Sequence, residues 1–591
     1  MKKIESFRRG ISSRLPSNSA QLFQDDRFLI VLLFLANLFL VFAVFLPNLS
    51  EINPWDEAAY ASSGQQLVDK GELPNLAGNP LTAVFYAISY LPFRNSIQWM
   101  VHSVSLGRLV LFSMLWLTTY KVVRELEKFT PVFVGLGILF VTPLAIEMLR
   151  FPTDPLFASF AGLALWQLLK YTKTREPAQL RNVSTFLGLS ALARNDGLVL
   201  FLIFAVISVP LIIRSSRWVR SLAAAALPFI ILVGGYIFLV GLLSGNFESG
   251  LAKRTYSNFE SGQQIVFVGS GELNAVIESR LEARRLFGTP AENANSVFKA
   301  ILHNPQAYLE RLGAVIKALP QTMLKAYGIR FSAVLLMLVL RGIFELIRRR
   351  EFLILTILML WPLHLLTGFV ITIFRTGHLQ FPFYIVFGLA SIGLAALVKN
   401  IKNRREMAIA SLYLIALILY GLFDNKLAIF YGAAVFLGGL MILRLSRQYS
   451  TTSMPAIYLL IFITGIIVRG QFPSPIIRTI GIDPKEQMVA YITQEFDEGT
   501  FIASGAPGVI WASKMDYAGL ISTDFPVNRN SEELYVWMRE QGIEAIYVDH
   551  GLYNAAPKIW DLIEDQIGSG WVRIFIVDQG NYQVLVPANR N

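Results

Sequence analysis

Apolar runs of helical length recur along almost the whole chain and alternate with short polar segments. They lie at 28–46, 105–123, 131–148, 154–169, 183–193, 197–213, 221–243, 322–340, 352–371, 380–398, 407–422, 427–443 and 455–468. A helix needs about 20 largely apolar residues to cross a bilayer. Most of these runs approach that length, and the run at 183–193 is the shortest. The pattern predicts a mainly α-helical, polytopic membrane protein with about thirteen transmembrane helices.

The polar segments divide the chain into three parts. We expect residues 1–27 to be a tail, and residues 28–469 to be the membrane region with long loops at 47–104 and 244–320. The first apolar run has no small-residue cleavage pattern, so it predicts an anchor rather than a signal peptide. Residues 470–591 have soluble patterning, which predicts a small α/β domain. Its helical patterns are Glu486–Phe496, Glu532–Gln541 and Lys558–Ile567, and its strand-like stretches are 500–504, 545–549, 573–578 and 582–586.

The basic residues indicate the orientation of the chain in the membrane. The N-terminal tail and every second short loop after it are rich in lysine and arginine, and together they hold half of the chain's 52 basic residues. Cytoplasmic loops carry such an excess. We therefore predict a plasma membrane protein with a cytoplasmic N-terminus. An odd number of spans places both long loops and the C-terminal domain on the outer face.

The amino-acid composition excludes several classes of protein and of functional site. Hydrophobic residues make up 54% of the chain and charged residues 16%, which excludes an ordinary soluble enzyme. The chain has no cysteine, so disulfides, thiolate metal sites and cysteine nucleophiles are excluded. The net charge of +11 is explained by the basic loops, and we expect no nucleic-acid partner.

An adjacent acidic pair, Asp56 and Glu57, follows the first apolar run by about ten residues, between Trp55 and Tyr60. One of these carboxylates would suit a general base at the membrane surface, where partial desolvation raises a carboxyl pKa. The alternative is a helix N-terminus whose acidic residues are favoured by the helix dipole. The stretch 79–93 that follows predicts an amphipathic or interfacial segment.

Two further outer turns carry charge. Asp154 follows Thr153 at the start of the fourth run, where an acid is costly unless it is paired or used. Thr153 or Asp154 acting as a helix cap is the alternative. Arg194 and Asp196 lie between the fifth and sixth runs, where a local charge pair that seals the turn would also explain them.

A fourth outer turn holds Arg375 and His378. Arginine matches phosphate bidentately, although a snorkelling side chain or a partner for a nearby acid would also account for Arg375. His378 is placed to ligate or to shuttle protons, but a lone histidine is commonly structural. Acids and cations gathered at one membrane level suit a lipid-borne, phosphate-linked substrate.

These motifs resemble those of C-type membrane glycosyltransferases (the GT-C fold). The resemblance rests on the stretch 54–60 with its acidic pair, on Asn79-Pro80-Leu81, and on the turns at Asp154, Arg194 and Arg375. It covers essentially the whole chain. It is closest to the superfamily of protein O-mannosyltransferases and lipid A aminoarabinose transferases, sometimes called family 39.

The resemblance implies transfer of a sugar from a polyprenyl-phosphate carrier to an acceptor hydroxyl on the outer face, with inversion. The acceptor would be a lipid, a glycan or a protein. Asp56 would be the base, with Glu57 as the alternative, and Asp154 would orient the acceptor or the sugar. Arg375, with Arg194 and His378, would bind the donor phosphate. Some C-type enzymes use a divalent cation, and Asp56 with Asp154 would be the ligands of a Mg²⁺ or Mn²⁺ ion.

Two other function classes fit part of the sequence. A transporter or lipid flippase also has many spans and charges at membrane depth, although here the acids gather at one face and no internal repeat is visible. A receptor or scaffold would explain the C-terminal domain but not the loop acids. The 244–320 loop fits either a lid over the site or a solvated cap.

Overall fold

The computed structural model describes most of the membrane region and most of the C-terminal part of the chain. The described residues are 30, 31, 34, 35, 38, 56–127, 149, 151–214, 217–245, 247–266, 274–327, 329–371, 382–400, 403–423, 434, 437, 438, 484–505, 507–520, 531–549, 557–565, 567, 568 and 570–588. The predicted N-terminal tail and the predicted spans 131–148 and 455–468 lie outside these residues, as do most of the spans 28–46 and 427–443.

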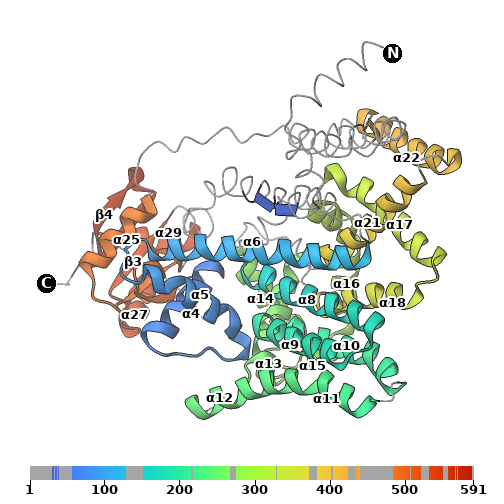
Figure 1. The fold of residues 1–591 in the computed structure, drawn as a ribbon. Helices are drawn as coiled ribbons and strands as arrows, with labels where there is room; N and C mark the ends of the chain where they lie inside the picture. Colours follow the sequence, from blue (N-terminus) through green and yellow to red (C-terminus); the bar gives the residue numbers. More distant parts are fainter. Residues whose placement is uncertain are drawn as a thin grey trace, which may run out of the picture.

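Apolar helices form where the hydrophobic runs predict them (Figure 1). Among them are α6 (Trp99–Leu126), α8 (Thr153–Thr174), α9 (Pro177–Ala193), α10 (Asp196–Ile213), α21 (Phe383–Lys399) and α22 (Arg404–Phe423). Four described stretches are long and apolar enough to cross a membrane: Trp99–Leu126, Asp196–Ile213, Trp218–Ser244 and Phe352–Val370. The total of thirteen spans stays a prediction.

Two of these four stretches change their helical pitch near a proline. From α11 (Trp218–Phe229) the chain passes through a π-helical turn, η5 (Ile230–Gly234), into α12 (Gly235–Ser244). From α18 (Phe352–Leu360) it passes through a 3₁₀ turn, η7 (Trp361–Leu365), into α19 (Leu366–Val370). Proline has no N–H group and its ring crowds the preceding turn, so one bond of the regular ladder is lost at Pro228 and one at Pro362, and the pitch changes beside each of them.

Two helices make contact through glycine. A Cβ atom on Gly342 of α17 (Ile329–Arg348) would lie 1.9 Å from the carbonyl oxygen of Leu389, and one on Gly393 of α21 would lie 2.0 Å from that of Leu338. The two backbones therefore touch at this crossing. Small residues permit such an approach between helices in a membrane, where packing replaces the hydrophobic effect as the driving force.

The segment before α17 differs from the prediction in its boundaries. We predicted a loop to residue 320 and a span at 322–340, but α16 (Pro305–Tyr327) runs through the first part of that apolar run and α17 takes the rest. Gly328, a weak helix former, stands between the two helices in the sequence. Hydropathy alone cannot locate such a boundary, because both sides of it are apolar. The loop also holds α13 (Leu251–Ser261), α14 (Asn274–Phe287) and α15 (Val297–His303).

The first long loop forms two short α-helices and two 3₁₀ turns. α4 (Asp56–Asp69) is followed by η3 (Leu76–Gly78), α5 (Pro80–Tyr90) and η4 (Leu91–Phe93). Tyr86 and Tyr90 on one face of α5 are fully buried, whereas Val84 and Ile88 on the other face are exposed. Apolar side chains are thus exposed on this helix, and the amphipathic or interfacial character of 79–93 stays a prediction.

The C-terminal residues form a five-stranded mixed sheet in the order β2-β1-β3-β5-β4. Strands β2 (Asp516–Gly519), β1 (Phe501–Ser504) and β3 (Ala545–Val548) are parallel, and β5 (Tyr582–Pro587) pairs antiparallel with both β3 and β4 (Trp571–Val577). The accompanying helices are α25 (Pro484–Glu495), α26 (Gly508–Ala512), α27 (Ser531–Glu540) and α29 (Pro557–Glu564). The predicted helices and strands are present, and β2 is an element that the sequence pattern did not indicate.

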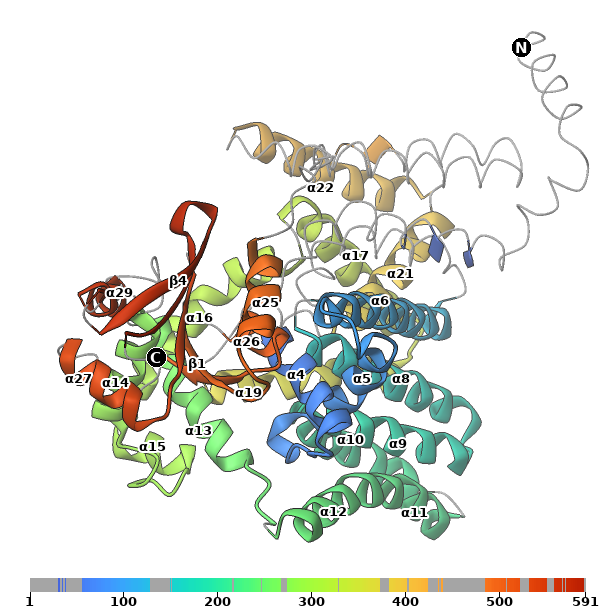
Figure 2. The same cartoon turned by 90° about the vertical axis from the view of Figure 1, so that its left-hand side faces the viewer.

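This α/β segment packs against the start of α6 and against α4 and α5 (Figures 1 and 2). Tyr90, Trp99 and Met100 share one hydrophobic cluster with Met488 and Ile510 of the segment. The indole N–H of the buried Trp99 donates a hydrogen bond of 2.9 Å to the carbonyl oxygen of Ala512. The contact therefore combines apolar burial with a satisfied polar group.

The carboxylate of Asp69 adds polar interactions to the contact between the α/β segment and α4 to α6. Asp69, the last residue of α4, accepts hydrogen bonds from the Tyr90 hydroxyl (2.8 Å) and the Gln65 amide (2.9 Å). Arg94 lies 2.8 Å from it, and Lys514 of the α/β segment lies 3.8 Å away. Burial raises the pKa of the Asp69 carboxyl, but these hydrogen bonds and positive charges outweigh burial and hold the pKa below its ordinary value.

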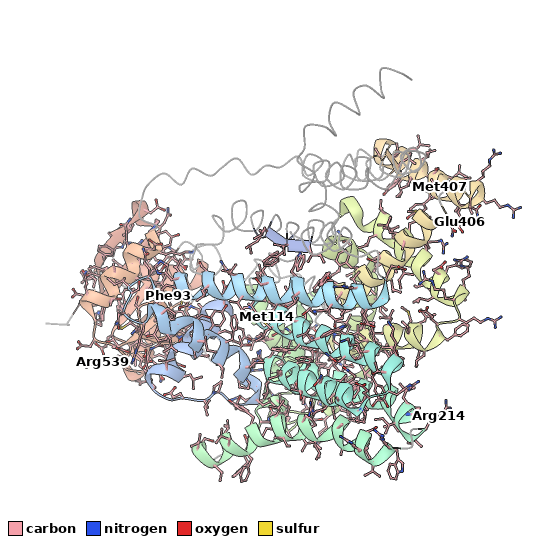
Figure 3. All side chains as sticks on the ribbon, in the orientation of Figure 1. Phe93, Met114, Arg214, Glu406, Met407 and Arg539 are labelled. Atoms are coloured by element: carbon pink, nitrogen blue, oxygen red, sulfur yellow. The ribbon has the colours of Figure 1, made fainter. Side chains whose placement is uncertain are left out.

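The other end of the bundle carries an ionic network between helix ends. Glu345 near the end of α17 pairs with Arg348 (2.7 Å), and Arg349 beyond α17 reaches Glu127 at the end of α6 (3.2 Å). Arg341 reaches Glu406 at the start of α22 (3.1 Å). Figure 3 shows Glu406 and Arg214 far from the strands, whereas Phe93 and Arg539 lie beside or within the α/β segment. Three of the predicted basic loops, those around Glu127, Arg349 and Glu406, are therefore linked at one end of the described helices.

Acidification tests the Asp69 contact. A lowered pKa means that folding favours the ionised carboxylate, so its stabilisation is complete above the unfolded pKa of about 4 and is lost as the pH falls through the lower folded value. We predict that Asp69→Asn is less stable than the wild type at pH 7 and that the difference narrows below pH ~4. Denaturant unfolding at several pH values, followed by limited proteolysis of the α/β segment, measures this.

Glu72→Gln is the control, because Glu72 is an exposed acid just beyond the same helix. Its stability should follow that of the wild type at every pH. A difference between Asp69→Asn and the wild type that stays constant across the acid range would contradict the ionic role of Asp69.

Candidate functional site

A buried ion pair joins the start of α4 to α6. Both Glu57 oxygens accept from Arg108: its Nε donates at 2.8 Å to Oε1, and its Nη2 pairs with Oε2. The two side chains are 1% and 3% exposed. A charge at this depth is tolerated only when it is paired and hydrogen-bonded. The pair therefore fixes the first turn of α4 against the helix that also carries Trp99.

A second charged group joins three helix ends. Arg194, which ends α9, pairs through Nη1 with Asp154 at the start of α8 and through Nε with Asp196 at the start of α10. The Thr153 hydroxyl donates to the same Asp154 oxygen at 3.2 Å. Burial lowers the pKa of Arg194, but the two carboxylates outweigh burial and raise it, so the guanidinium stays charged. Both carboxylates lie in the first turn of a helix, where the dipole favours negative charge.

A threonine links this group to the irregular helix. The Thr367 hydroxyl of α19 lies 3.0 Å from Oδ1 of Asp196 and 2.8 Å from the carbonyl oxygen of His364. A hydroxyl has one proton, and the charged carboxylate is the stronger acceptor. His364 itself is buried in η7, and its ring lies 5.5 Å from that of Phe157 on α8. The 3₁₀ turn of this helix is thus tied to the Arg194 group.

A tyrosine connects α4 with the two long loops. The Tyr60 hydroxyl accepts hydrogen bonds from the Asn79 amide (2.9 Å) and from Arg254 of α13 (3.2 Å). Asn79 has φ 57°, a left-handed conformation that asparagine tolerates, and Pro80 follows it as the first residue of α5. A hydrogen bond from Thr82 to the carbonyl oxygen of Ala193 (3.5 Å) brings α5 onto the end of α9.

Comparisons with solved structures identify the architecture. The crystal structure of ArnT from Cupriavidus metallidurans bound to undecaprenyl phosphate aligns with 95% of this chain and 98% of its own, with a TM-score of 0.55 and 13% identity. The apo structure of the same protein aligns with 94% and 97%, with a TM-score of 0.53 and 12% identity. The chain has the C-type glycosyltransferase fold. No protein-family model and no curated protein matches the sequence.

The structure describes some of the predicted site residues and not others. Glu57, Asp154, Arg194 and Asp196 are all in ion pairs at helix ends. Asp56 is the first residue of α4, and its side chain lies outside the described part. Arg375 and His378 lie outside the described residues, so their donor-binding role stays a prediction. The local charge pair considered for Arg194 and Asp196 is present and extends to Asp154.

Sequence reasoning missed three residues that bond to residues of the candidate site: Arg108 pairs with Glu57, Thr367 bonds to Asp196, and Arg254 bonds to Tyr60. Arg108 lies inside the apolar run 105–123, and a charge within a predicted span was the signal that could have indicated its pairing. Thr367 and Arg254 gave no such signal, because threonine is common in apolar helices and Arg254 lies in a polar loop. Among the described residues, no cluster of three or more histidine or acidic side chains is placed to hold a metal ion.

Removal of the Thr367 hydroxyl tests the hydrogen bond between α19 and Asp196. We predict that Thr367→Val lowers the free energy of unfolding by about 1–3 kcal/mol, because a carboxylate loses a donor in a partly buried place. Thr367→Ser retains the hydroxyl and should recover most of the loss. Denaturant unfolding of both variants in detergent measures the difference. Equal stability of the Val and Ser variants would show that the hydrogen bond contributes nothing.

Proposed function

We propose that this protein transfers a sugar from a polyprenyl-phosphate carrier to an acceptor hydroxyl at the outer face of the membrane. The observation that carries the proposal is the C-type glycosyltransferase fold over nearly the whole chain, shared with an ArnT structure that binds undecaprenyl phosphate. The acids and cations of α4, α8, α9 and α10 gather at linked helix ends within that fold. A binding surface for a phosphate-linked lipid needs such charges at the membrane boundary.

Asp56 is our candidate for the base. Glu57 is bound by two nitrogens of Arg108, and a carboxylate so held is a poor proton acceptor. Asp56 precedes Tyr60 by four residues in α4, and residues four apart share a face of a helix. The face that carries Tyr60 is the one in contact with Asn79 and Arg254. Asp56 would therefore belong to the polar side of α4.

The proposed reaction needs one base and one phosphate-binding cation. The acceptor oxygen attacks the anomeric carbon, its proton passes to Asp56, and the bond from that carbon to the phosphate oxygen breaks. Attack opposite the leaving group inverts the configuration. Polyprenyl phosphate leaves as a stable anion, so a general acid of the kind that glycosidases use is not required. A fixed cation would stabilise the charge that develops on the phosphate.

Arg375 is our first candidate for that cation. Arg194 is already balanced by two carboxylates, so its field at a second anion is weak, and its role would be to hold Asp154 in place. The tie of Thr367 to Asp196 fixes α19, which ends five residues before Arg375 in the sequence. His378 lies three residues further along and would assist the same phosphate.

A divalent cation between Asp56 and Asp154 is a separate proposal. Carboxylates suit Mg²⁺ or Mn²⁺. Asp154 already accepts from Arg194 and Thr153, so an ion there would compete with a guanidinium. No step of the proposed reaction depends on a metal ion, and activity measured with and without a chelator separates the two cases.

Replacement of the base tests the reaction. We predict that Asp56→Asn retains folding and carrier-lipid binding but lowers the rate of sugar transfer by about 10²- to 10⁴-fold, because general bases contribute rate factors of this size. The assay incubates purified protein in detergent with labelled polyprenyl-phosphate sugars and acceptor extracts and measures covalent products. A transporter or flippase would give no covalent product from the wild type either.

Glu57→Gln is the matched control for the adjacent carboxylate. It should reduce stability, because Arg108 loses its charged partner, while turnover per folded molecule stays within about tenfold of the wild type. If Asp56→Asn turns over normally and Glu57→Gln does not, the base is Glu57.

Removal of the predicted phosphate-binding cation gives a second test. We predict that Arg375→Ala raises the KM for the donor by about 10- to 100-fold, since a charge-assisted hydrogen bond contributes about 1.5–3 kcal/mol. The KM for the acceptor should be unchanged. Arg539→Ala is the control, because Arg539 is an exposed arginine on α27, far from these helix ends (Figure 3). Unchanged donor affinity in Arg375→Ala would remove its phosphate role.

A further inference from the structure

A row of large apolar side chains is exposed on α15 and α16, within the loop that we expected to be either a lid or a solvated cap. Phe298 and Leu302 of α15 are 69% and 60% exposed, and Leu309 and Ile316 of α16 are 63% and 55% exposed. The spacings of four and seven residues place each pair on one face of its helix. Water alone is a poor partner for such a surface.

The row does not result from a poorly folded loop. On its other side, α13 to α16 enclose a small core of Tyr256, Phe259, Phe287 and Ala300. The buried Arg311 of α16 lies over the rings of Phe259 (4.4 Å) and Phe287 (5.1 Å) and donates at 2.7 Å to the carbonyl oxygen of Phe259. The core side of these helices is therefore satisfied within the loop, and the exposed row is a second face.

A similar apolar face is exposed on a helix of the membrane region. On α17, which follows α16 directly in the chain, Leu336, Leu340 and Phe344 are 54%, 57% and 59% exposed. Their spacing of four residues is that of one helix face turned toward lipid. In Figure 2, where α6 is strongly foreshortened, α13 to α16 lie to one side of α6 and α8 to α12. The loop helices thus stand beside the bundle, where a bilayer would meet them.

The polar neighbours of the row fit a lipid surface. Lys299 and His303 of α15 and Lys317 of α16 are exposed next to the apolar side chains. Lysine beside an apolar face is typical of helices that lie in the interface of an anionic membrane. Glu310 is the one exposed acid on these two helices.

We propose that α15 and α16 lie in the bilayer interface, with Phe298, Leu302, Leu309 and Ile316 buried among the lipids. The partner of this surface is the membrane itself. The inference rests on the membrane location of the chain and does not depend on the proposed reaction. Its consequence concerns the site: α13 belongs to the same rigid unit and carries Arg254, so lipid contact at α15 and α16 fixes the depth of the group around Tyr60.

The absence of cysteine makes this testable by single-site labelling. The chain has no native thiol, so one introduced cysteine carries one nitroxide label. Phe298→Cys, Leu302→Cys, Leu309→Cys and Ile316→Cys sample the row, and each site is exposed, so the substitution leaves the core intact. Glu292→Cys in the turn before α15 and Glu310→Cys on α16 are the controls, because both are exposed polar positions and neither is three or four residues from a member of the row on the same helix.

The labelled protein is reconstituted in vesicles of phosphatidylcholine and phosphatidylglycerol. Electron paramagnetic resonance then compares relaxation by oxygen, which partitions into lipid, with relaxation by a water-soluble nickel chelate. We expect the four row positions to be relaxed several-fold more by oxygen than by nickel, and the two controls to show the reverse. The pattern should repeat every three to four residues along α16, as for a helix half-immersed in lipid.

Two results would overturn the proposal. Strong nickel relaxation at all six positions would place the helices in water, as a solvated cap. Low relaxation by both reagents at the row positions would mean that protein covers them, either a second copy or another part of this chain. The sugar-transfer assay is independent of either result, so failure here leaves the proposed function standing.

Discussion

The structure depends on one requirement: a charge buried at the membrane boundary needs a partner, and at the helix ends of the candidate site that partner is a charge of opposite sign. The Arg194 guanidinium at the end of α9 lies between Asp154 and Asp196 at the starts of α8 and α10. This one group therefore meets the requirement for three helices. Without the arginine, two carboxylates would face each other in a partly desolvated place. Breaking such a group costs several kcal/mol, whereas the intact group contributes little net stability. Its value lies in fixing where the three helix ends meet.

The same requirement explains why the two ends of the bundle differ. At the end near Glu127, Glu345 and Glu406 the partners are side chains at helix ends, and the side chains of Arg348, Arg349 and Arg341 are 56%, 27% and 13% exposed. At the end near the strands, the Glu57–Arg108 pair is almost completely buried, and Tyr60, Asn79, Arg254 and Thr367 add hydrogen bonds to groups around it. A pair with one partner in contact with water, such as Arg348 with Glu345, is partly screened and holds position less firmly. Buried and hydrogen-bonded ones hold it firmly, as a site for chemistry requires.

Much of the fold could be predicted from the sequence, because helices in a bilayer satisfy their own backbone and so depend mainly on length and hydropathy. The apolar runs at 105–123, 154–169 and 197–213 lie within α6, α8 and α10. The boundary between α16 and α17 could not be predicted, since apolar residues lie on both sides of it. Strand β2 was missed because its residues Asp516–Gly519 lack the alternation that indicates a strand, and its place at the sheet edge arises from pairing with β1.

The sequence indicated which types of residue lie in the candidate site, but not which of them pair with one another. Residue type and turn position indicated that Asp154 and Arg194 would share one level, but pairing between residues forty positions apart is a property of helix packing. The adjacent acids Asp56 and Glu57 illustrate the limit. Successive residues of a helix differ by about 100° in direction, so two neighbours cannot both face the same group. Arg108 holds both oxygens of Glu57, and adjacency in the sequence could not indicate this pairing because it depends on how α6 packs against α4.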